Sequence, residues 1–247
     1  MASEFRTPDW RGYRMDVSNP HRTLEPLERE VEVVAACLET LHQAGVLPHT
    51  EYDHERMLAH RRAVAELFEI PWTAISPRMQ RLLYALNAIV QPQNMLAAGV
   101  FCGNTFISNA GAAVGPGACY TARNLIGIEI NPREAARAER NVRRIDPSGV
   151  ARVVAADAVD FVREFPEPVN LLYLDADGDS RRGKGIYLEI LEGCYEDMPP
   201  GSIVLAHNSV NCAGDLKEYL AFVRDPANFR ASVNVILDPE GLEVSVR

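Results

Sequence analysis

The sequence of 247 residues has no long apolar run that could cross a membrane. Its apolar stretches are all much shorter than the ~20 residues that a spanning helix needs. The first residues, Met-Ala-Ser-Glu-Phe-Arg, lack the basic start and the apolar stretch of a secretory signal. We therefore expect no membrane partner and a cytoplasmic location.

Basic residues are in the minority, because 25 Lys and Arg stand against 34 Asp and Glu, for a net charge of -9. Proteins that bind nucleic acid neutralise phosphates with a basic patch or stripe. The densest basic run, from Arg133 to Arg144, is interleaved with acids and alanines at helical spacing, which is typical of a solvated helix face. Nucleic acid is therefore not an expected partner.

Cysteines are few, and their spacing matches no paired motif. The five of them form no Cys-x-x-Cys pair, and their number is odd. This pattern favours free thiols in a reducing compartment and indicates neither a disulfide framework nor a zinc cluster.

The first third of the chain is predicted to be helical. Apolar residues at helical spacing predict helices over 24–44, 55–70 and 77–89. We expect residues 1–75 to form a helical extension, which could cover a pocket as a lid or pair two copies as a homodimer.

From residue 95 onward, apolar strand-like runs alternate with amphipathic helical stretches, the pattern of βα units in a parallel sheet. The end of the chain differs, because two strand-like runs flank a tight turn and predict an antiparallel hairpin. We expect residues 76–247 to form an α/β domain with a Rossmann-like, seven-stranded, mostly parallel sheet. The expected strands are 95–101, 125–130, 151–155, 169–175, 202–207, 231–237 and 242–246, and the expected helices are 104–113, 132–145, 157–164, 185–197 and 213–224.

The most informative segment is Met-Leu-Ala-Ala-Gly-Val-Phe-Cys-Gly-Asn-Thr, residues 95–105. Its apolar start predicts a buried strand, and Gly99 and Gly103 allow the backbone to approach a ligand closely. The next strand ends in Glu129, an acid placed to bind ribose hydroxyls. The pattern therefore predicts a nucleoside site.

These motifs resemble those of the class I S-adenosylmethionine (SAM)-dependent methyltransferases, in the catechol and caffeoyl-CoA O-methyltransferase branch. Ser76 to Ile107 is similar to the lead helix and first glycine motif of that branch, and Leu171 to Asp177 to its fourth-strand motif. The resemblance implies that SAM is the cofactor. It implies contacts with SAM from the residues Gly99, Phe101, Cys102, Gly103, Asn104, Thr105, Glu129, Ile130, Asn131, Asp157, Ala158 and Asp175.

Two of these acids have structural alternatives. Glu129 could instead be an acid that favours the start of the helix at Pro132, through the helix dipole. Asp157 could cap the helix that begins near Ala158, and it could do so while also contacting adenine.

Several positions depart from the branch. Ala97 stands where its first strand carries an acid, and Gly178 stands where its catechol members carry a base lysine. The metal-binding positions become Asp175 and His207-Asn208, and an imidazole suits magnesium poorly, because that ion prefers oxygen ligands. We therefore predict an enzyme that does not depend on magnesium, with no metal ligand assigned.

The predicted catalytic residues are His207, Asp175, Asn208 and Tyr187. His207 ends a parallel strand and could be a general base, a ligand to a softer metal or a structural histidine. Lys184 lies on a glycine-rich loop and is expected to be a solvated side chain.

Two further groups of side chains have expected positions. Tyr84, Phe101 and Tyr187 are aromatic candidates for flanking the sulfonium, although each could simply belong to the core. The histidines at 49, 54 and 60 are expected at the surface.

Two chemistries fit this cofactor site. The first is O-methylation of a small molecule, which leaves S-adenosylhomocysteine (SAH). The alternative is a methyltransferase-like cyclase that closes SAM into a small-ring amino acid, 1-aminocyclopropane-1-carboxylate or azetidine-2-carboxylate, and releases methylthioadenosine. We predict the first, with a role in biosynthesis, and rank a catalytically inert binding subunit last.

Overall fold

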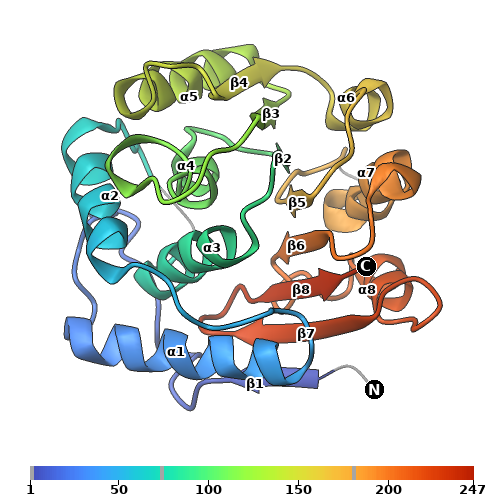
Figure 1. Ribbon diagram of the computed structural model, residues 1–247, viewed down its shortest axis with the longest axis horizontal. Coiled ribbons are helices and arrows are strands. Elements are labelled where there is room, and N and C mark those ends of the chain that lie inside the picture. The colour runs from blue at the N-terminus through green and yellow to red at the C-terminus, as the bar shows by residue number, and fades with distance from the viewer. Residues whose placement is uncertain (1–2, 73–74, 180–181) are drawn as a thin grey trace.

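The computed structural model describes residues 3–72, 75–179 and 182–247, and its centre is a sheet of eight strands (Figure 1). The order across the sheet is β1-β7-β8-β6-β5-β2-β3-β4. Only β8 runs antiparallel to its neighbours in the described part of the chain. The strands are β1 (Ser3–Arg6), β2 (Asn94–Ala98), β3 (Asn124–Glu129), β4 (Ala151–Ala155), β5 (Leu171–Leu174), β6 (Ile203–His207), β7 (Ala231–Ile236) and β8 (Leu242–Val246).

The predicted fold class is confirmed, but the predicted count of seven strands is wrong by one. The additional strand, β1, pairs in parallel with β7 at the edge of the sheet. Its sequence, Ser-Glu-Phe-Arg, is short and half polar, so it carries no strand signal of its own. The strand forms because β7 offers it a row of free backbone groups.

Helices cover both faces of the sheet and create two apolar cores. One core lies under α1 (Leu27–Gln43), α3 (Pro77–Val90), α4 (Asn104–Ala110) and α5 (Pro132–Ile145), and α2 (His54–Leu67) packs outside α3 and α5. The other lies under α6 (Ala158–Glu164), α7 (Ile186–Cys194) and α8 (Lys217–Val223). Short 3-10 turns occur at η1 (Gly115–Gly117), η2 (Gly183–Gly185) and η3 (Tyr195–Asp197).

Strand β2 shows why the sheet has two buried faces. Met95 and Ala97 point into the first core, while Leu96 and Ala98 point into the second. All four are fully buried, so the strand reads as one continuous apolar run, as strands of parallel sheets do.

The N-terminal segments are fastened to α3 by buried arginines. Arg78, 1% exposed, donates to both carboxylate oxygens of Asp9 at 2.9 Å and to Glu25 at 2.6 and 2.7 Å. Arg81, fully buried, contacts Glu30 at the start of α1. A buried charge is stable only when it is paired, so these contacts hold the described residues up to Glu30 against the sheet domain.

The structure corrects one expected surface residue. His60 is 4% exposed and lies against Gly111, whose missing side chain makes room for the ring. Burial lowers its pKa to about 4, so the imidazole is neutral at physiological pH.

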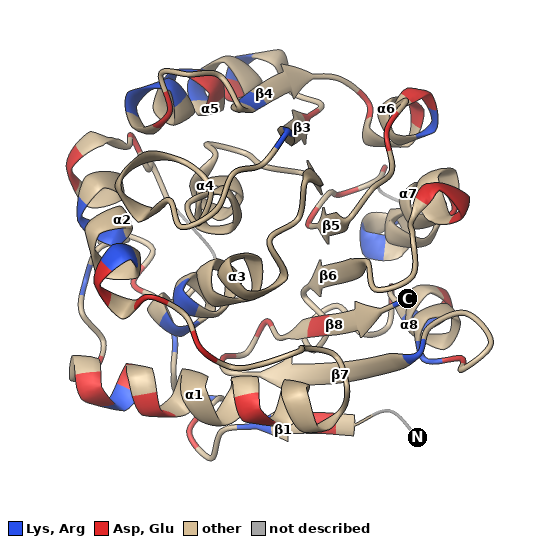
Figure 2. Cartoon of the chain, in the orientation of Figure 1, with Lys and Arg blue, Asp and Glu red and all other residues tan. Residues whose placement is uncertain are grey.

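Basic and acidic residues are interspersed along the helices and loops (Figure 2). On α5, Arg137 pairs with Glu134 and Arg143 with Glu139 at helical spacing, so the basic run forms the predicted solvated face. None of the helices in the described ranges is both long and apolar enough to traverse a bilayer.

Candidate functional site

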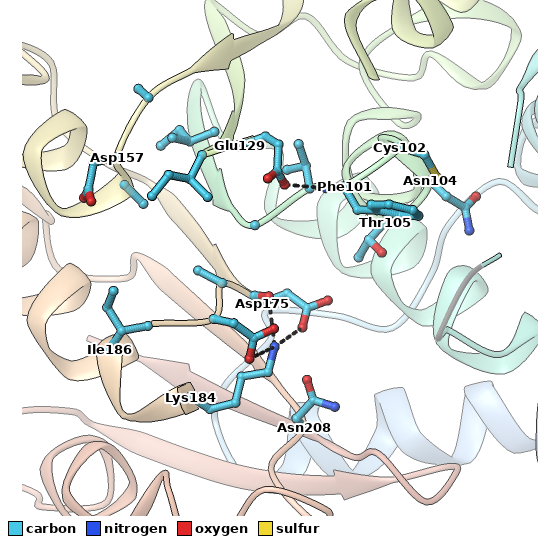
Figure 3. Close-up of a pocket in the computed structure, with 18 of the residues that line it drawn as sticks. Phe101, Cys102, Asn104, Thr105, Glu129, Asp157, Asp175, Lys184, Ile186 and Asn208 are labelled. Carbon is cyan, nitrogen blue, oxygen red and sulfur yellow. Dashed lines mark hydrogen bonds and ion pairs between the residues drawn. The ribbon is translucent and has the colours of Figure 1, made fainter. Parts of the chain in front are cut away.

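A cavity of about 500 Å³ opens at the carboxyl edge of the parallel strands. The loops that follow β2, β3, β4, β5 and β6 all contribute to its lining, together with one residue from the α2–α3 connection. Ligands of open α/β sheets bind outside this edge. Most of the predicted site residues come together here, as Figure 3 shows.

The turn after β2 is built around two glycines. Gly99 has φ +78°, and a Cβ on it would lie 2.5 Å from the backbone of Ala176. Gly103, at φ +88°, is the residue before α4 and does not itself line the cavity. Phe101 also adopts a positive φ of 48°, which is rare outside glycine and is typical of functional sites.

Glu129 extends from the end of β3 into the cavity. Its Oε2 accepts a hydrogen bond of 2.8 Å from the backbone N–H of Phe101, and its Oε1 accepts one of 3.0 Å from that of Asn131. Each oxygen keeps a second lone pair for a ligand hydroxyl. The carboxylate is thus held in place by the glycine turn beside it.

Asn131 has a different place from the one predicted. Its side chain caps α5 by accepting a hydrogen bond of 3.0 Å from Arg133 N–H, and it is outside the cavity lining. The neighbouring Ile130 does line the cavity, and it is 68% exposed.

Asp157 both lines the cavity and caps a helix. Its carboxylate accepts a hydrogen bond of 2.8 Å from Val159 N–H at the start of α6. Ala158 lies beside it in the lining. Asp157 therefore caps α6, and its place in the cavity lining is compatible with a ligand contact as well.

Lys184 is not the solvated lysine expected from the sequence. It is 7% exposed, and its Nζ lies 2.9 Å from Asp175 Oδ1, 2.9 Å from the Asp175 carbonyl oxygen and 3.5 Å from Asp177 Oδ1 (Figure 3). Within this loop, Gly178 N–H donates to the carbonyl of Gly183, and a 3-10 turn follows at Gly183–Gly185. Residues 180–181 of this loop lie outside the described residues.

The charges of this group are mutually stabilised. Burial disfavours the carboxylate of Asp175, but His207 and Lys184 outweigh it and hold the pKa of Asp175 below its ordinary value. Burial likewise opposes the charge of Lys184, and Asp175 and Asp177 raise its pKa nonetheless. Lys184 is therefore an ammonium and Asp175 a carboxylate at neutral pH.

His207 lies behind Asp175 rather than in the cavity. It is fully buried, its Nδ1 is 3.3 Å from Asp175 Oδ2, and it does not line the cavity. Burial alone would lower the pKa of His207, but the carboxylate of Asp175 raises it. Asn208 does line the cavity, at a positive φ of 66°, with its amide donating to Asn211 Oδ1 at 3.1 Å.

The tyrosines lie away from the cavity lining. Tyr187 is fully buried beneath Lys184, with its ring edge-on to Tyr219. Tyr84 is fully buried on α3, and its hydroxyl donates to the carbonyl of Gly117. Of the three aromatic candidates, only Phe101 lines the cavity.

The donor set does not fit a divalent metal ion. Both carboxylate oxygens of Asp175 already face a cationic or imidazole nitrogen, and the ammonium of Lys184 lies where a cation would approach. Within the described ranges, no group of three or more His, Cys, Asp or Glu is arranged to hold a metal.

Sequence reasoning missed Trp72. This side chain from the α2–α3 connection lines the cavity, is 52% exposed, and lies 4.7 Å from the Phe101 ring, centroid to centroid. A lone tryptophan in a loop carries no periodic or motif signal, so only the tertiary arrangement reveals it.

Comparisons with known proteins agree with this geometry. The family described as a methyltransferase domain matches residues 96–209, from β2 to the residues just after β6. A catechol O-methyltransferase of Niastella koreensis is 26% identical over 163 residues, which is 64% of this chain and 68% of the relative.

This chain contains a methyltransferase domain. Its sequence is similar to that of a catechol O-methyltransferase, which confirms the resemblance predicted from its motifs.

Solved structures share the fold of this chain. An O-methyltransferase of Bacillus cereus in complex with SAH has a TM-score of 0.57 at 18% identity. The match covers 88% of this chain and 100% of the Bacillus chain. An O-methyltransferase of Streptomyces achromogenes in complex with SAM has a TM-score of 0.57 at 17% identity, covering 90% of this chain and 99% of that one.

Proposed function

We propose that the protein transfers the methyl group of SAM to an oxygen of a small molecule without help from a divalent metal ion. The contact between Lys184 and Asp175 is the single observation that carries the metal-free part. A protein ammonium there supplies the positive charge that a metal would bring, and it occupies the carboxylate that a metal would need.

The adenosine half of the cofactor would lie between the ends of β3 and β4. Glu129 is oriented by two backbone N–H groups, so its free lone pairs can accept hydrogen bonds from both ribose hydroxyls. Asp157, Ala158 and Ile130 then border the space for adenine.

The methionine half would lie along the glycine turn toward β5. Gly99 allows the turn to approach Ala176 closely, and Cys102, Asn104 and Thr105 line the cavity on this side. SAM supplies an electrophilic methyl group on a sulfonium. The residues around it position the acceptor in line with that group and exclude water.

The acceptor would enter on the side of Trp72 and Asn208. Trp72 offers an aromatic face beside Phe101, and Lys184 presents its charge to the same space. About 500 Å³ has to hold the reacting parts of both substrates, which favours a small acceptor.

The test is to incubate the purified protein with SAM, first alone and then with a panel of small hydroxyl compounds, in buffer containing EDTA. We expect SAH and a methylated product only when an acceptor is present, at a rate that EDTA does not reduce. Methylthioadenosine formed from SAM alone would replace the proposal with the cyclase alternative. A rate that EDTA abolishes and magnesium restores would refute the metal-free part.

A further inference from the structure

Lys184 has one N–H that is not committed to Asp175. An ammonium has three donors, and two of the Nζ contacts, at 2.9 Å, go to the backbone and side-chain oxygens of Asp175. The third contact, with Asp177 Oδ1, is 3.5 Å long, and Asp177 is 72% exposed. Lys184 and Asp177 both line the cavity, so the N–H that faces Asp177 lies at the cavity wall.

The other polar groups on the acceptor side are poorly suited to remove a proton. Asp175 is a stabilised carboxylate whose oxygens face Lys184 and His207. His207 is fully buried behind it and does not reach the cavity. Asn208 has an amide side chain, which does not titrate.

We propose that the ammonium of Lys184 binds the acceptor oxygen as an anion. The N–H that now faces Asp177 would donate to this oxygen. This inference rests on the proposed function and specifies its acceptor as a hydroxyl acidic enough to ionise, such as a phenol or an enol. The electrostatic stabilisation of the bound anion replaces a general base.

The reaction then balances without a further group. The acceptor O–H ionises, and its proton leaves to solvent through the open side of the cavity near the exposed Asp177. The oxygen lone pair forms the new C–O bond as the C–S bond breaks, and the electrons of that bond return to sulfur to give a neutral thioether. Lys184 keeps all its protons throughout.

Asp177 gives the site a second function in this scheme. In the absence of an acceptor it partly neutralises the exposed side of Lys184. An acceptor anion must displace it, and two adjacent anions repel each other. Removing the charge of Asp177 should therefore strengthen the binding of an anionic acceptor, while removing that of Lys184 should abolish it.

4-Nitrophenol can report this directly, because its anion absorbs visible light and the neutral form does not. The protein is first saturated with SAH, which is confirmed by calorimetry, and the absorbance of bound 4-nitrophenol is then followed against pH. We expect the native protein to raise the ionisation constant of bound 4-nitrophenol about tenfold, the effect of one opposite charge within hydrogen-bonding distance.

Three variants test the assignment. Lys184→Met should remove the increase, and Asp177→Asn should enlarge it. Arg182→Met removes a charge from the same loop outside the cavity lining and should leave it unchanged. The gain in Asp177→Asn does not depend on the Lys184 variant folding.

The outcomes separate this inference from the proposed function. Failure of SAH to bind would refute the proposed function itself. Three outcomes with normal SAH binding would overturn the assignment of Lys184 alone. The protein could fail to bind 4-nitrophenol, it could leave the ionisation constant of bound 4-nitrophenol unchanged, or the increase in that constant could persist in Lys184→Met.

Discussion

Nδ1 of His207 lies 3.3 Å from Oδ2 of Asp175, on the opposite side of that carboxylate from Lys184. One buried carboxylate therefore lies between two nitrogen groups, and only one of these faces the cavity. The two nitrogen groups therefore differ in role: Lys184 can contact a ligand in the cavity, whereas His207 orients Asp175 from the buried side.

Replacing His207 with Gln should destabilise the fold in a pH-dependent way. The folded pKa of Asp175 is below its ordinary 3.8, so its contribution to stability is present above that value and lost as pH falls through the folded pKa. The folded pKa of His207 is above its ordinary 6.5, so its contribution is full below 6.5 and lost as pH rises through the folded pKa.

The loss in free energy of unfolding for His207→Gln should thus be greatest between 3.8 and 6.5, where we expect about 2 kcal/mol. Urea denaturation of both proteins across this range measures it. A loss in free energy of unfolding that stays the same at alkaline pH would show that the charge of the His207 imidazole is not involved.

Replacing Glu129 with Gln should weaken cofactor binding. The carboxylate loses its charge and half its acceptor capacity, while Phe101 N–H and Asn131 N–H still need acceptors. We expect the dissociation constant for SAH, measured by calorimetry, to rise roughly 10- to 100-fold.

Glu134→Gln is the matched control, because Glu134 is an acid on α5 that pairs with Arg137 outside the cavity lining. Equal SAH affinities of Glu129→Gln and Glu134→Gln would contradict the ribose role. Glu129 would then only stabilise the start of α5 through the helix dipole.

Trp72 should report occupancy of the cavity by fluorescence. The chain has two tryptophans, so Trp10→Phe isolates Trp72. Because Trp72 is 52% exposed and lies against Phe101, a ligand that covers it should shift its emission to shorter wavelength.

The measurement is an SAH titration of Trp10→Phe, with Trp72→Phe as the control that should lose the response and keep its stability within about 0.5 kcal/mol. Unchanged emission at saturation would place Trp72 away from the bound ligand.

Glu240 should limit stability at alkaline pH. Burial and the neighbouring Asp238 raise its pKa from 4.5 to about 7, and His207 opposes this only in part. An acid with a raised folded pKa makes the folded state less stable as pH rises from 4.5 through 7.

Glu240→Gln should therefore be more stable than the native protein by about 1 kcal/mol near pH 8 and equal to it near pH 4, below the ordinary pKa of 4.5. Thermal melting at both pH values tests this, with the exposed Glu218→Gln as control. A gain that is the same at both pH values would point to packing rather than charge.

The main architecture was predictable because its signals are local. Alternating apolar runs and amphipathic stretches predicted the β2 to β6 units, and the turn residues predicted the β7–β8 hairpin. The glycine turn and Glu129 were also visible, since the carboxyl ends of parallel strands meet at one edge.

What failed depended on contacts between distant segments. The edge strand β1 forms only against β7, and His60 is buried only because Gly111 lies opposite. Lys184 appeared solvated because its loop is rich in glycine, and the inward fold depends on an ion pair with Asp175, nine residues earlier. Periodicity cannot reveal such pairs.

The close approach of Gly99 to the loop after β5 restricts how the acceptor range of this protein can be engineered. Any larger residue at 99 would collide with main chain at 175 and 176, which no rotamer change could relieve. A mutant library should leave that position constant and place its diversity at Trp72 and Ile186, whose side chains shape the cavity.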